Sequence, residues 1–553
     1  MIRVVLAALA LATLLTLPFV LRSAGAPGSA PRSGSGATET VIIMTPDNEA
    51  IRSEMGRAFR AHMARRGRAV EVDWRAPGGT SEIGRYLSSQ YAVAFELYWT
   101  RQLGRRWSPE IAAGYSRAPS PSPSPSSPSS SPAADARRVF LASPVGIGID
   151  LLFGGGPTEF THQAAAGRLV DSGIRQRHPE WFGPQGIPEE VGGERTWDRD
   201  GRWVGVCFST FGICFNHDAL ARLRVPTPPS SWGALAEPVF HGELALADPT
   251  KSGSVGKAFE MIIQSQVNQA RRRMAAAGAL DEAALDRSAL TEGWAAAMRL
   301  IRRVGGNARY FTDAATRVPL DVSTGDAAAG MCIDFYGRFQ SEVTNVEAGG
   351  GRPRMGFRTA RGETGVNADP IALLRGAPHP ALALEFIEFV LSEEGQKVWA
   401  FRRGTPGGPE RYTLHRLPVL PRLYDHAFDQ YRADPDDNPY EDVRGFVYRE
   451  SLTGPLFNAI SFIVKAMCID PADELTAAAA ALAAAHFPPR ATALFDDVSA
   501  VDYATVAGPV RAALQSPDPL DAARLSARLV AEFRAQYRRV AALARAEGEG
   551  DGA

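Results

Sequence analysis

The sequence has few cysteines and almost no net charge, and both shortages exclude functions. Its 553 residues include four cysteines, and their spacing matches neither a zinc motif nor a CxxC redox motif. The formal net charge is -1, from 60 basic and 61 acidic residues, so the chain lacks the basic excess typical of nucleic-acid binding. We therefore expect no nucleic-acid partner. The hydrophobic share of 45% is ordinary for a globular protein, and the length predicts two or more domains.

A long apolar run lies near the N-terminus, at residues 4–21, with an arginine on either side. Its length of about 18 residues is at the lower limit for a membrane span and long for the core of a signal peptide. Pro27 directly follows the small residues at which cleavage would be expected. We expect residues 1–24 to be an export signal that can stay as an anchor, and residues 25–38 to be a linker. In the periplasm the cysteines can pair or remain small buried side chains, and the sequence does not distinguish these outcomes.

Strands, small-residue turns and helices follow one another after the linker. An apolar strand at residues 41–44 precedes a turn with Pro46 and a helix with apolar side chains at helical spacing. A strand at 70–74, a turn at Gly78-Gly79 and another helix repeat this order. The succession predicts an α/β domain with a parallel sheet, in which ligands bind beyond the carboxyl ends of the strands.

Two segments depart from this pattern. Residues 116–136, which read SRAPSPSPSPSSPSSSPAADA, are rich in proline and serine and predict an extended surface insertion. Residues 470–553 are rich in alanine and arginine and predict a helical C-terminal extension.

Three small residues, Ser252-Gly253-Ser254, stand where a helix is expected to begin. A serine at this position commonly caps the helix by accepting a bond from a backbone N–H. Small side chains can also leave the first-turn N–H groups open, and the positive end of the helix then attracts an anion. Spacing alone favours the cap, and both interpretations stay open at this point.

Four stretches, taken in order, resemble the substrate-binding proteins of bacterial ABC importers. They read FSTFGICFNHDAL, PPSSWGALAEPVFHGELALADPTKSGS, TGDAAAGMCIDFY and NADPIALLRGAPHPALALEFIEFVLSEEGQKVW. The resemblance covers about residues 41–465 and is nearest to the ferric-iron and phosphonate-like branch. It implies the two-lobed type 2 periplasmic-binding fold, with two Rossmann-like α/β lobes joined by hinge strands, and no catalytic residues.

The resemblance also implies how the chain is divided. Lobe one would comprise residues 39–206, with the proline- and serine-rich insertion, and be completed by 359–469. Residues 207–358 would form the hinge and lobe two. A small ligand would be trapped when the lobes close, and permease subunits of the importer would recognise the closed form of a monomeric protein.

The implied ligand contacts lie on the loops that face the cleft. They are Thr45, Asn48, Glu49, Gly79, Thr80, Ser81, Ser209, Thr210, Ser252, Gly253, Ser254, Asp334 and Tyr336. With the family in view, cleft binding becomes the favoured interpretation of Ser252–Ser254. Capping, a favourable acid in a first helical turn and bonds to neighbouring backbone are the structural alternatives for the other loops.

The implied ligand is a small anion or a metal with an anion. Iron-binding relatives often have a histidine where this chain has Asn48, and two adjacent tyrosines where it has Phe335-Tyr336. Glu49, Asp334 and Tyr336 could still offer oxygen ligands to ferric iron with a synergistic anion. The anion is the favoured ligand, and no resident cofactor is expected.

Two other functions remain as alternatives. An enzyme of thiamine-degrading or transferase type would need Cys332 as nucleophile, with Asp334 on the same strand face, and no base is evident. A ligand sensor tethered by the N-terminal segment would need partner proteins at the C-terminal helices.

Overall fold

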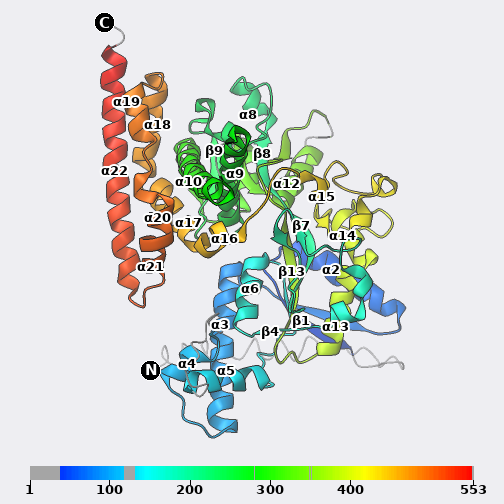
Figure 1. The fold of residues 1–553 in the computed structure, drawn as a ribbon. Coiled ribbons are helices and arrows are strands. Elements are labelled where there is room, and N and C mark those ends of the chain that lie inside the picture. The colour runs from blue at the N-terminus through cyan, green and yellow to red at the C-terminus, as the bar shows by residue number, and fades with distance from the viewer. Residues whose placement is uncertain (1–37, 118–130, 279–280, 348, 350, 551–553) are drawn as a thin grey trace, which may run out of the picture.

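The computed structural model describes residues 38–117, 131–278, 281–347, 349 and 351–550, which form two α/β lobes and a helical unit (Figure 1). The predicted signal or anchor segment, residues 1–24, lies outside the described residues, as do the linker up to residue 37 and residues 118–130 of the insertion. The two-lobed α/β fold with a helical C-terminal region is confirmed.

Lobe one is built on a seven-stranded sheet in the order β14-β7-β13-β3-β1-β2, with β4 paired to β13. The predicted parallel pairing is right for β1 with β2 and β3, whereas β13 runs antiparallel to β3 and β7 because the chain returns from lobe two. The strands are β1 (Glu39–Met44), β2 (Val70–Arg75), β3 (Leu151–Phe153), β4 (Leu169–Val170), β7 (Val204–Ser209), β13 (Asn367–Leu374) and β14 (Leu417–Pro418).

Helices cover both faces of this sheet, as buried strands require. They include α2 (Glu49–Arg65), α3 (Thr80–Leu97), α6 (Pro157–Ala165), α7 (Ile174–Arg177), α13 (Pro380–Leu391) and α14 (Glu393–Ala400). Because α2, α3 and α6 each follow a parallel strand, their N-termini meet at one edge of the sheet.

The insertion is shorter than predicted. Residues 132–136 belong to α5 (Pro132–Ala142), and Ala136 is buried in an aromatic core with Phe95 and Phe140. Helix α5 packs on α4 (Pro109–Gly114) so closely that a Cβ on Gly114 would lie 2.4 Å from the Cβ of Ala133. The apolar spacing within α5, and not the proline and serine content before it, decides where the insertion ends.

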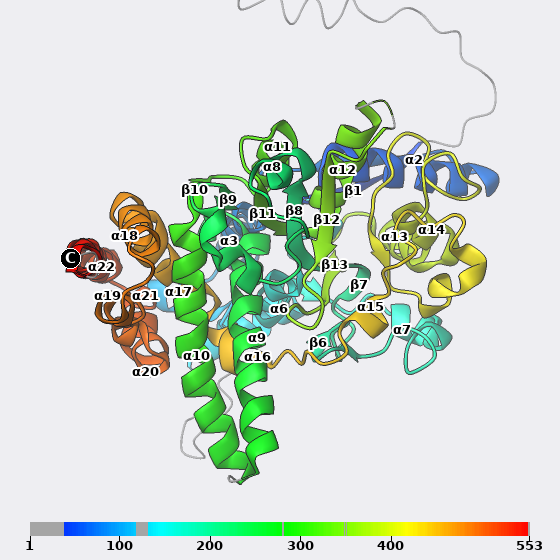
Figure 2. The ribbon, with the colours of Figure 1, turned by 90° about the horizontal axis from the view of Figure 1, so that it is seen from above.

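Lobe two has a five-stranded sheet in the order β10-β9-β11-β8-β12. Its strands are β8 (Phe211–Asn216), β9 (Leu244–Ala247), β10 (Ala308–Thr312), β11 (Ala329–Ile333) and β12 (Met355–Thr359). Its helices are α8 (His217–Arg222), α9 (Gly253–Ala277), α10 (Glu282–Gly306), α11 (Arg317–Thr324) and α12 (Asp334–Glu347). Helix α9 ends at Gly278, which has a left-handed φ of +72°, and α10 returns beside it as the long hairpin in Figure 2.

The chain crosses between the lobes twice by way of strands. Thr210 alone separates β7 in the first sheet from β8 in the second, and residues 360–366 connect β12 back to β13. After β14 the chain passes through α15 (Pro439–Asp442) and α16 (Glu450–Thr453) to α17 (Phe457–Val464), which packs on α9. The end of the segment predicted to complete lobe one therefore lies on lobe two.

The C-terminal unit consists of α18 (Ala472–Ala484), α19 (Pro489–Phe495), α20 (Tyr503–Thr505), α21 (Arg511–Leu514) and α22 (Pro519–Gly550). It packs against α10 of lobe two, on the side away from the α9 face (Figure 2). Trp294 of α10 donates a hydrogen bond to the carbonyl of Val501, and fully buried Arg302 donates to the carbonyls of Phe495 and Asp497. These buried contacts make the unit an integral neighbour of lobe two.

Among the described helical segments, residues Glu450–Ile469 have the length and composition that could cross a membrane, with a mean hydropathy of 1.6. Because 56% of that window is buried inside the protein, packing in the core explains the composition equally well.

Candidate ligand-binding site

A cavity of about 920 Å³ lies between the two lobes, at the edge where the strand-to-helix loops meet. Of the predicted contacts, the structure places seven on its wall. They are Gly79, Thr80 and Ser81 from lobe one and Ser252, Gly253, Ser254 and Tyr336 from lobe two. Loops more than 170 residues apart in the sequence thus share one cavity, as ligand binding at a two-lobed cleft requires.

The N-terminus of α9 reaches the cavity without a side-chain cap. Ser252 occupies the N-cap position, yet its hydroxyl makes no cap bond and lies 3.1 Å from the Ser254 hydroxyl. The capping interpretation of Ser252 is therefore wrong. The first-turn N–H groups and the positive end of a 25-residue helix are available to an anion.

Two helices of lobe one present their N-termini to the same cavity. Gly79 occupies the N-cap position of α3 and Gly156 that of α6, so neither helix has a side-chain cap. Glu82 lies near the start of α3, where a Cβ on Gly79 would be 3.1 Å from its Oε2 atom, and it pairs with Arg85 at 2.8 Å. The first turns of α3 and α6 thus already hold carboxylates of the protein, Glu82 and Glu159. The first turn of α9 holds none, so α9 has the strongest attraction for a ligand anion.

The loop before α6 contains three glycines in succession, Gly154 to Gly156, each with a positive φ. A Cβ on Gly155 would lie 2.7 Å from the Thr80 hydroxyl, which donates to the Gly155 carbonyl at 3.3 Å. A Cβ on Gly154 would lie 2.7 Å from Oδ2 of Asp47. Only glycine permits this approach of the loop to its neighbours. The run of glycines between a strand and a helix is the sequence signal that could identify this loop.

Arg168 supplies a cation at the lobe-one end of the cavity. Its side chain is buried, with 7% of the residue exposed, and donates at 2.8 Å to both the Ser88 hydroxyl and Oε1 of Gln163. No carboxylate in the described part of the chain forms an ion pair with it. A buried guanidinium without a counter-charge favours an anionic ligand nearby.

The two lysines of the wall, in contrast to Arg168, are already paired with carboxylates. Lys251 lies 2.6 Å from Asp313, and buried Lys257 lies 2.6 Å from Glu194 and 3.0 Å from Glu260. Burial raises the pKa of Glu194 to about 7, against the lowering effect of Lys257. Since Glu194 is on β6 (Glu194–Arg195), which pairs with β5 (Glu190–Val191), this pair connects the lobe-one hairpin to α9 of lobe two.

A second charged group lies behind the cavity wall. The side chain of Arg416 is 1% exposed and donates to a carboxylate oxygen of Asp369. It also donates to Sγ of Cys207 at 2.9 Å, and its guanidinium carbon lies 4.1 Å from the ring centre of Phe335. Burial and neighbouring Asp369 raise the pKa of Asp47 to about 7. Asp47 and Asp369 line the cavity, and sequence reasoning missed both.

Tyr336 lines the cavity as a neutral phenol. Burial, and then the charge of Asp47, raise its pKa to about 12. It can donate a hydrogen bond to a ligand oxygen at neutral pH, whereas a phenolate would need a strong cation beside it.

The first loop contributes a different residue from those predicted. Asn48 caps α2 by accepting from the backbone N–H of Ile51 at 3.1 Å, and the Thr45 hydroxyl accepts from the N–H of Asp47 at 3.0 Å. The Glu49 side chain is 78% exposed and pairs with Arg52 at 2.8 Å. None of the three predicted residues lies on the cavity wall, and Asp47 lies there in their place.

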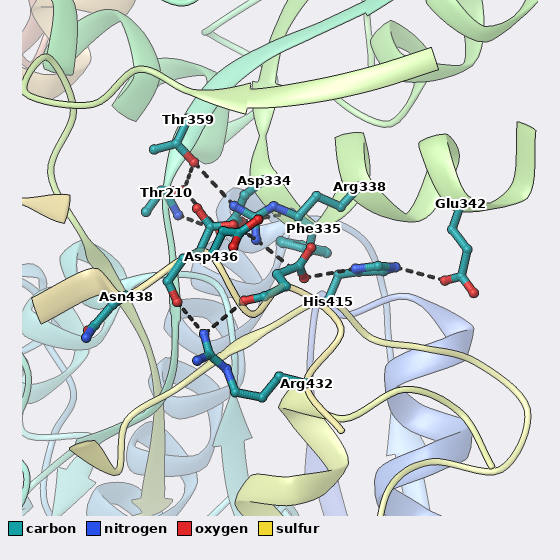
Figure 3. Close-up of polar contacts among 12 residues, drawn as sticks. Thr210, Asp334, Phe335, Arg338, Glu342, Thr359, His415, Arg432, Asp436 and Asn438 are labelled. Carbon is teal, nitrogen blue, oxygen red and sulfur yellow. Dashed lines mark hydrogen bonds and ion pairs between the residues drawn. The ribbon is translucent and has the colours of Figure 1, made fainter. Parts of the chain in front are cut away.

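Ser209, Thr210 and Asp334 belong to the hinge and not to the cavity wall. Oδ2 of Asp334 accepts from the N–H of Thr210 at 2.9 Å and its hydroxyl at 3.2 Å, and Oδ1 accepts from the N–H of Phe335 (Figure 3). Burial raises the pKa of Asp334 to about 6, although Arg338 lowers it. Ser209 is buried, and its hydroxyl has no hydrogen-bond partner among the described residues.

The proposed oxygen ligands for iron are therefore not gathered at one place. Of Glu49, Asp334 and Tyr336, Tyr336 alone lies on the cavity wall. Asp334 is the first residue of α12, so it does not share a strand face with Cys332 as expected. Burial and neighbouring Cys214 raise the pKa of the Cys332 thiol well above its ordinary value, which disfavours a thiolate nucleophile.

Helix α12 connects the cavity to the loops that return from lobe one (Figure 3). Arg338, one turn after Asp334, lies 2.9 Å from Asp437 and 3.4 Å from Asp434. His415 lies between Glu342 at 2.8 Å and Asp434 at 3.0 Å. The helix that presents Tyr336 to the cleft is thereby held to residues of the lobe-one return.

These features describe a two-lobed protein with a cavity between the lobes that is lined by helix N-termini. Residues 149–417 match the family model of the bacterial extracellular solute-binding proteins, so the predicted resemblance is confirmed for that part of the chain. All four cysteines are free and buried, which answers the question of pairing that the sequence left open.

Curated relatives and solved structures give more distant similarities. The chain is 24% identical over 197 residues to the phosphoglycerate transport regulatory protein PgtC of Salmonella typhimurium and of Salmonella typhi. The match covers 36% of this chain and spans 40% of the length of those relatives.

Two solved structures are also similar. AfuA from Actinobacillus pleuropneumoniae, with fructose-6-phosphate bound, has 14% identity and a TM-score of 0.41 over 73% of this chain and 97% of that one. Iron-bound HitA from Pseudomonas aeruginosa has 13% identity and a TM-score of 0.45 over 77% and 99%.

Proposed function

We propose that the protein is the extracytoplasmic solute-binding component of an ABC importer and captures a small organic anion between its lobes. The uncapped N-terminus of α9 on the cavity wall is the observation that supports this proposal most directly. Arg168 adds a positive charge from the opposite lobe.

The cavity size favours an organic anion over a single ion. A volume of about 920 Å³ falls in the range of roughly 300–1,000 Å³ that holds small organic molecules. Phosphate or carboxylate oxygens would accept from the α9 N–H groups, Ser254 and Tyr336. Ferric iron with an anion is the lesser candidate. Of its three proposed protein ligands, Tyr336 lines the cavity, whereas Glu49 and Asp334 do not.

The remaining parts of the proposal concern place and partners. Residues 1–24 would direct export and could anchor the chain to the inner membrane, and permease subunits would recognise the monomer after hinge closure. The mass of the mature protein, measured after purification from its host, separates a cleaved form from an anchored one.

Ligand binding is tested with a panel of named solutes. Phosphoglycerate, fructose-6-phosphate, inorganic phosphate and ferric citrate are each titrated against the purified chain by calorimetry, with thermal unfolding in parallel. We expect an organic phosphate to bind one per chain and to raise the unfolding temperature with concentration. Failure of all four to bind or stabilise would contradict the proposal.

A substitution at α9 tests where the anion binds. Ser254→Asp places a negative charge at the helix start and should weaken anion binding at least tenfold, because charge-assisted bonds contribute about 1.5–3 kcal/mol each. Ser89→Asp, on an exposed position of α3, is the matched control and should bind normally. Equal affinities for the two variants would place the anion elsewhere.

A membrane-tethered sensor is the second candidate. The relatives that match this chain carry the name transport regulatory protein, and the helical C-terminal unit offers a surface beyond the two lobes. Deletion of this protein would abolish uptake under the importer proposal, whereas loss of a sensor would leave the transporter able to take up solute and would change its expression.

A further inference from the structure

A second cavity, of about 470 Å³, lies between lobe two and the C-terminal unit. It shares no lining residue with the cleft. Lobe two contributes Gly233, Ala236, Glu237, Pro238, His241, Arg303 and Asn307, and the C-terminal unit contributes Ala479, Leu482, Ala483, Phe487, Thr492 and Phe495. Its volume is in the range of sites for small organic molecules.

Apolar and polar groups share the wall, and of its two charged side chains Arg303 is neutralised whereas Glu237 is exposed. Arg303 donates from Nη2 to both carboxylate oxygens of Asp496, at 2.9 and 2.7 Å. Leu482 and Phe495 are buried and face the space together with small alanines. An anionic ligand is therefore disfavoured, because it would lose its water without gaining a free cation and would lie near the carboxylate of Glu237.

Two polar atoms at this cavity have no partner among the described residues. They are Nδ1 of His241 and the hydroxyl oxygen of Thr492, and both atoms are buried. Buried polar atoms normally have hydrogen-bond partners. A ligand with one hydroxyl group can supply a donor to the imidazole nitrogen and an acceptor to the threonine.

The rim of the cavity has an unusual backbone. His486 and Phe487, in succession, have φ angles of +56° and +59°, a left-handed conformation that costs non-glycine residues free energy. The strained turn holds Phe487 at the wall with 39% of the residue still exposed. An aromatic side chain placed partly open at a cavity mouth can stack on a ring.

We propose that this cavity is a second binding site, for a small neutral aromatic molecule that carries a hydroxyl group. The ring packs against Leu482, Ala483 and Phe487, and the hydroxyl bonds His241 and Thr492. Because the walls come from two units, the occupant joins the C-terminal helices to lobe two.

The test uses 2-naphthol as the probe and the full chain. Calorimetry should show one 2-naphthol per chain with the cleft either empty or filled. Ala483→Trp fills the cavity and should weaken binding at least tenfold. Ala484→Trp, an exposed neighbour on the same helix, is the matched control and should bind like the original chain.

A second variant and a second probe keep the result independent of folding. Thr492→Val keeps the shape but removes the hydroxyl, and should reduce the preference for 2-naphthol over 2-methoxynaphthalene. Naphthalene-2-sulfonate, an anion of similar shape, should bind at least tenfold more weakly than 2-naphthol. No binding of 2-naphthol to the original chain, or equal binding to both tryptophan variants, would overturn the proposal.

Discussion

His415 shows how single charged residues hold the lobes together. Burial lowers its pKa, but Asp434 and Glu342 outweigh that effect and raise the pKa to about 9. Glu342 is on α12 of lobe two, whereas Asp434 is on the return from lobe one. The imidazolium thus contributes to the connection between the cleft helix and the rest of the molecule.

Stability should therefore fall in a defined pH range. A histidine with an unfolded pKa of about 6.5 and a raised folded pKa stabilises fully below pH 6.5, and the contribution is lost as pH rises to about 9. The loss is at most about 3 kcal/mol. Urea unfolding at pH 6, 7.5 and 9 measures it.

The matched variants are His415→Gln and His426→Gln. Asp429 raises the pKa of His426 as well, but water screens this pair at the fully exposed imidazole, so the substitution should change the pH dependence much less than His415→Gln. The His415→Gln chain should lose less stability between pH 6.5 and 9 than the original chain. Parallel curves for the original chain and His415→Gln would exclude this role.

Arg168 provides a second residue-scale prediction. Arg168→Met removes the unpaired cation at the lobe-one end and should weaken binding of an organic phosphate about tenfold or more. Arg138→Met is the control, because Arg138 is exposed, already pairs with Asp135 and does not line the cavity. Calorimetric affinities measure both, and similar losses would argue against a special place for Arg168.

At the scale of elements, the cleft depends on loops that follow strands. The glycine loop of residues 154–156 is the clearest case, because its backbone contacts two neighbouring loops. It positions the start of α6 beside Thr80 and Asp47.

Gly155→Ala should destabilise the chain by about 1–3 kcal/mol, since φ is +103° and the new Cβ would lie 2.7 Å from the Thr80 hydroxyl. Gly242→Ala is the control, with φ of +70° and no atom within 4 Å of the new Cβ. Urea unfolding should show a greater loss for Gly155→Ala. An equal loss would mean that backbone strain alone, without the contact, sets the cost.

The element pattern also decides what the sequence could predict. The pattern of a strand, small residues and a helix identified Gly79–Ser81 and Ser252–Ser254, because these residues lie in the short loops between a strand and the helix that follows it. The same pattern missed Asp47 by one position, since the sequence does not reveal that Asn48 would be the helix cap. Arg168 and Asp369 reach the cavity wall from distant segments, as Arg416 reaches Asp369, and only the folded arrangement of the sheet brings them together.

At the scale of the whole molecule, the C-terminal unit is tied to lobe two by α10. Trp294 is buried and donates to the Val501 carbonyl at 2.9 Å. Its neighbour Arg302 lies 5.4 Å from the ring of Phe533. The sequence predicted helices here but not their docking, because α10 gives no local sign of a partner more than 190 residues later.

Trp294→Ala should reduce stability by about 3–5 kcal/mol, as for other large buried aromatic side chains. The loss should appear first as faster amide hydrogen exchange in α10, α18 and α22. Trp107→Ala, at a half-buried position in the other lobe, should leave exchange in these helices unchanged. If the faster exchange in the Trp294→Ala chain were confined to lobe one, the described contact between α10 and the C-terminal unit would be contradicted.

The contact between Gly114 and Ala133 has a consequence for how this chain can vary. Because α4 and α5 touch where they leave and re-enter the described fold, the distance between the two attachment points does not depend on how many residues join them. Insertion of a peptide tag between α4 and α5 should therefore be tolerated, and the proposed ligand binding at the opposite edge of lobe one should be unchanged.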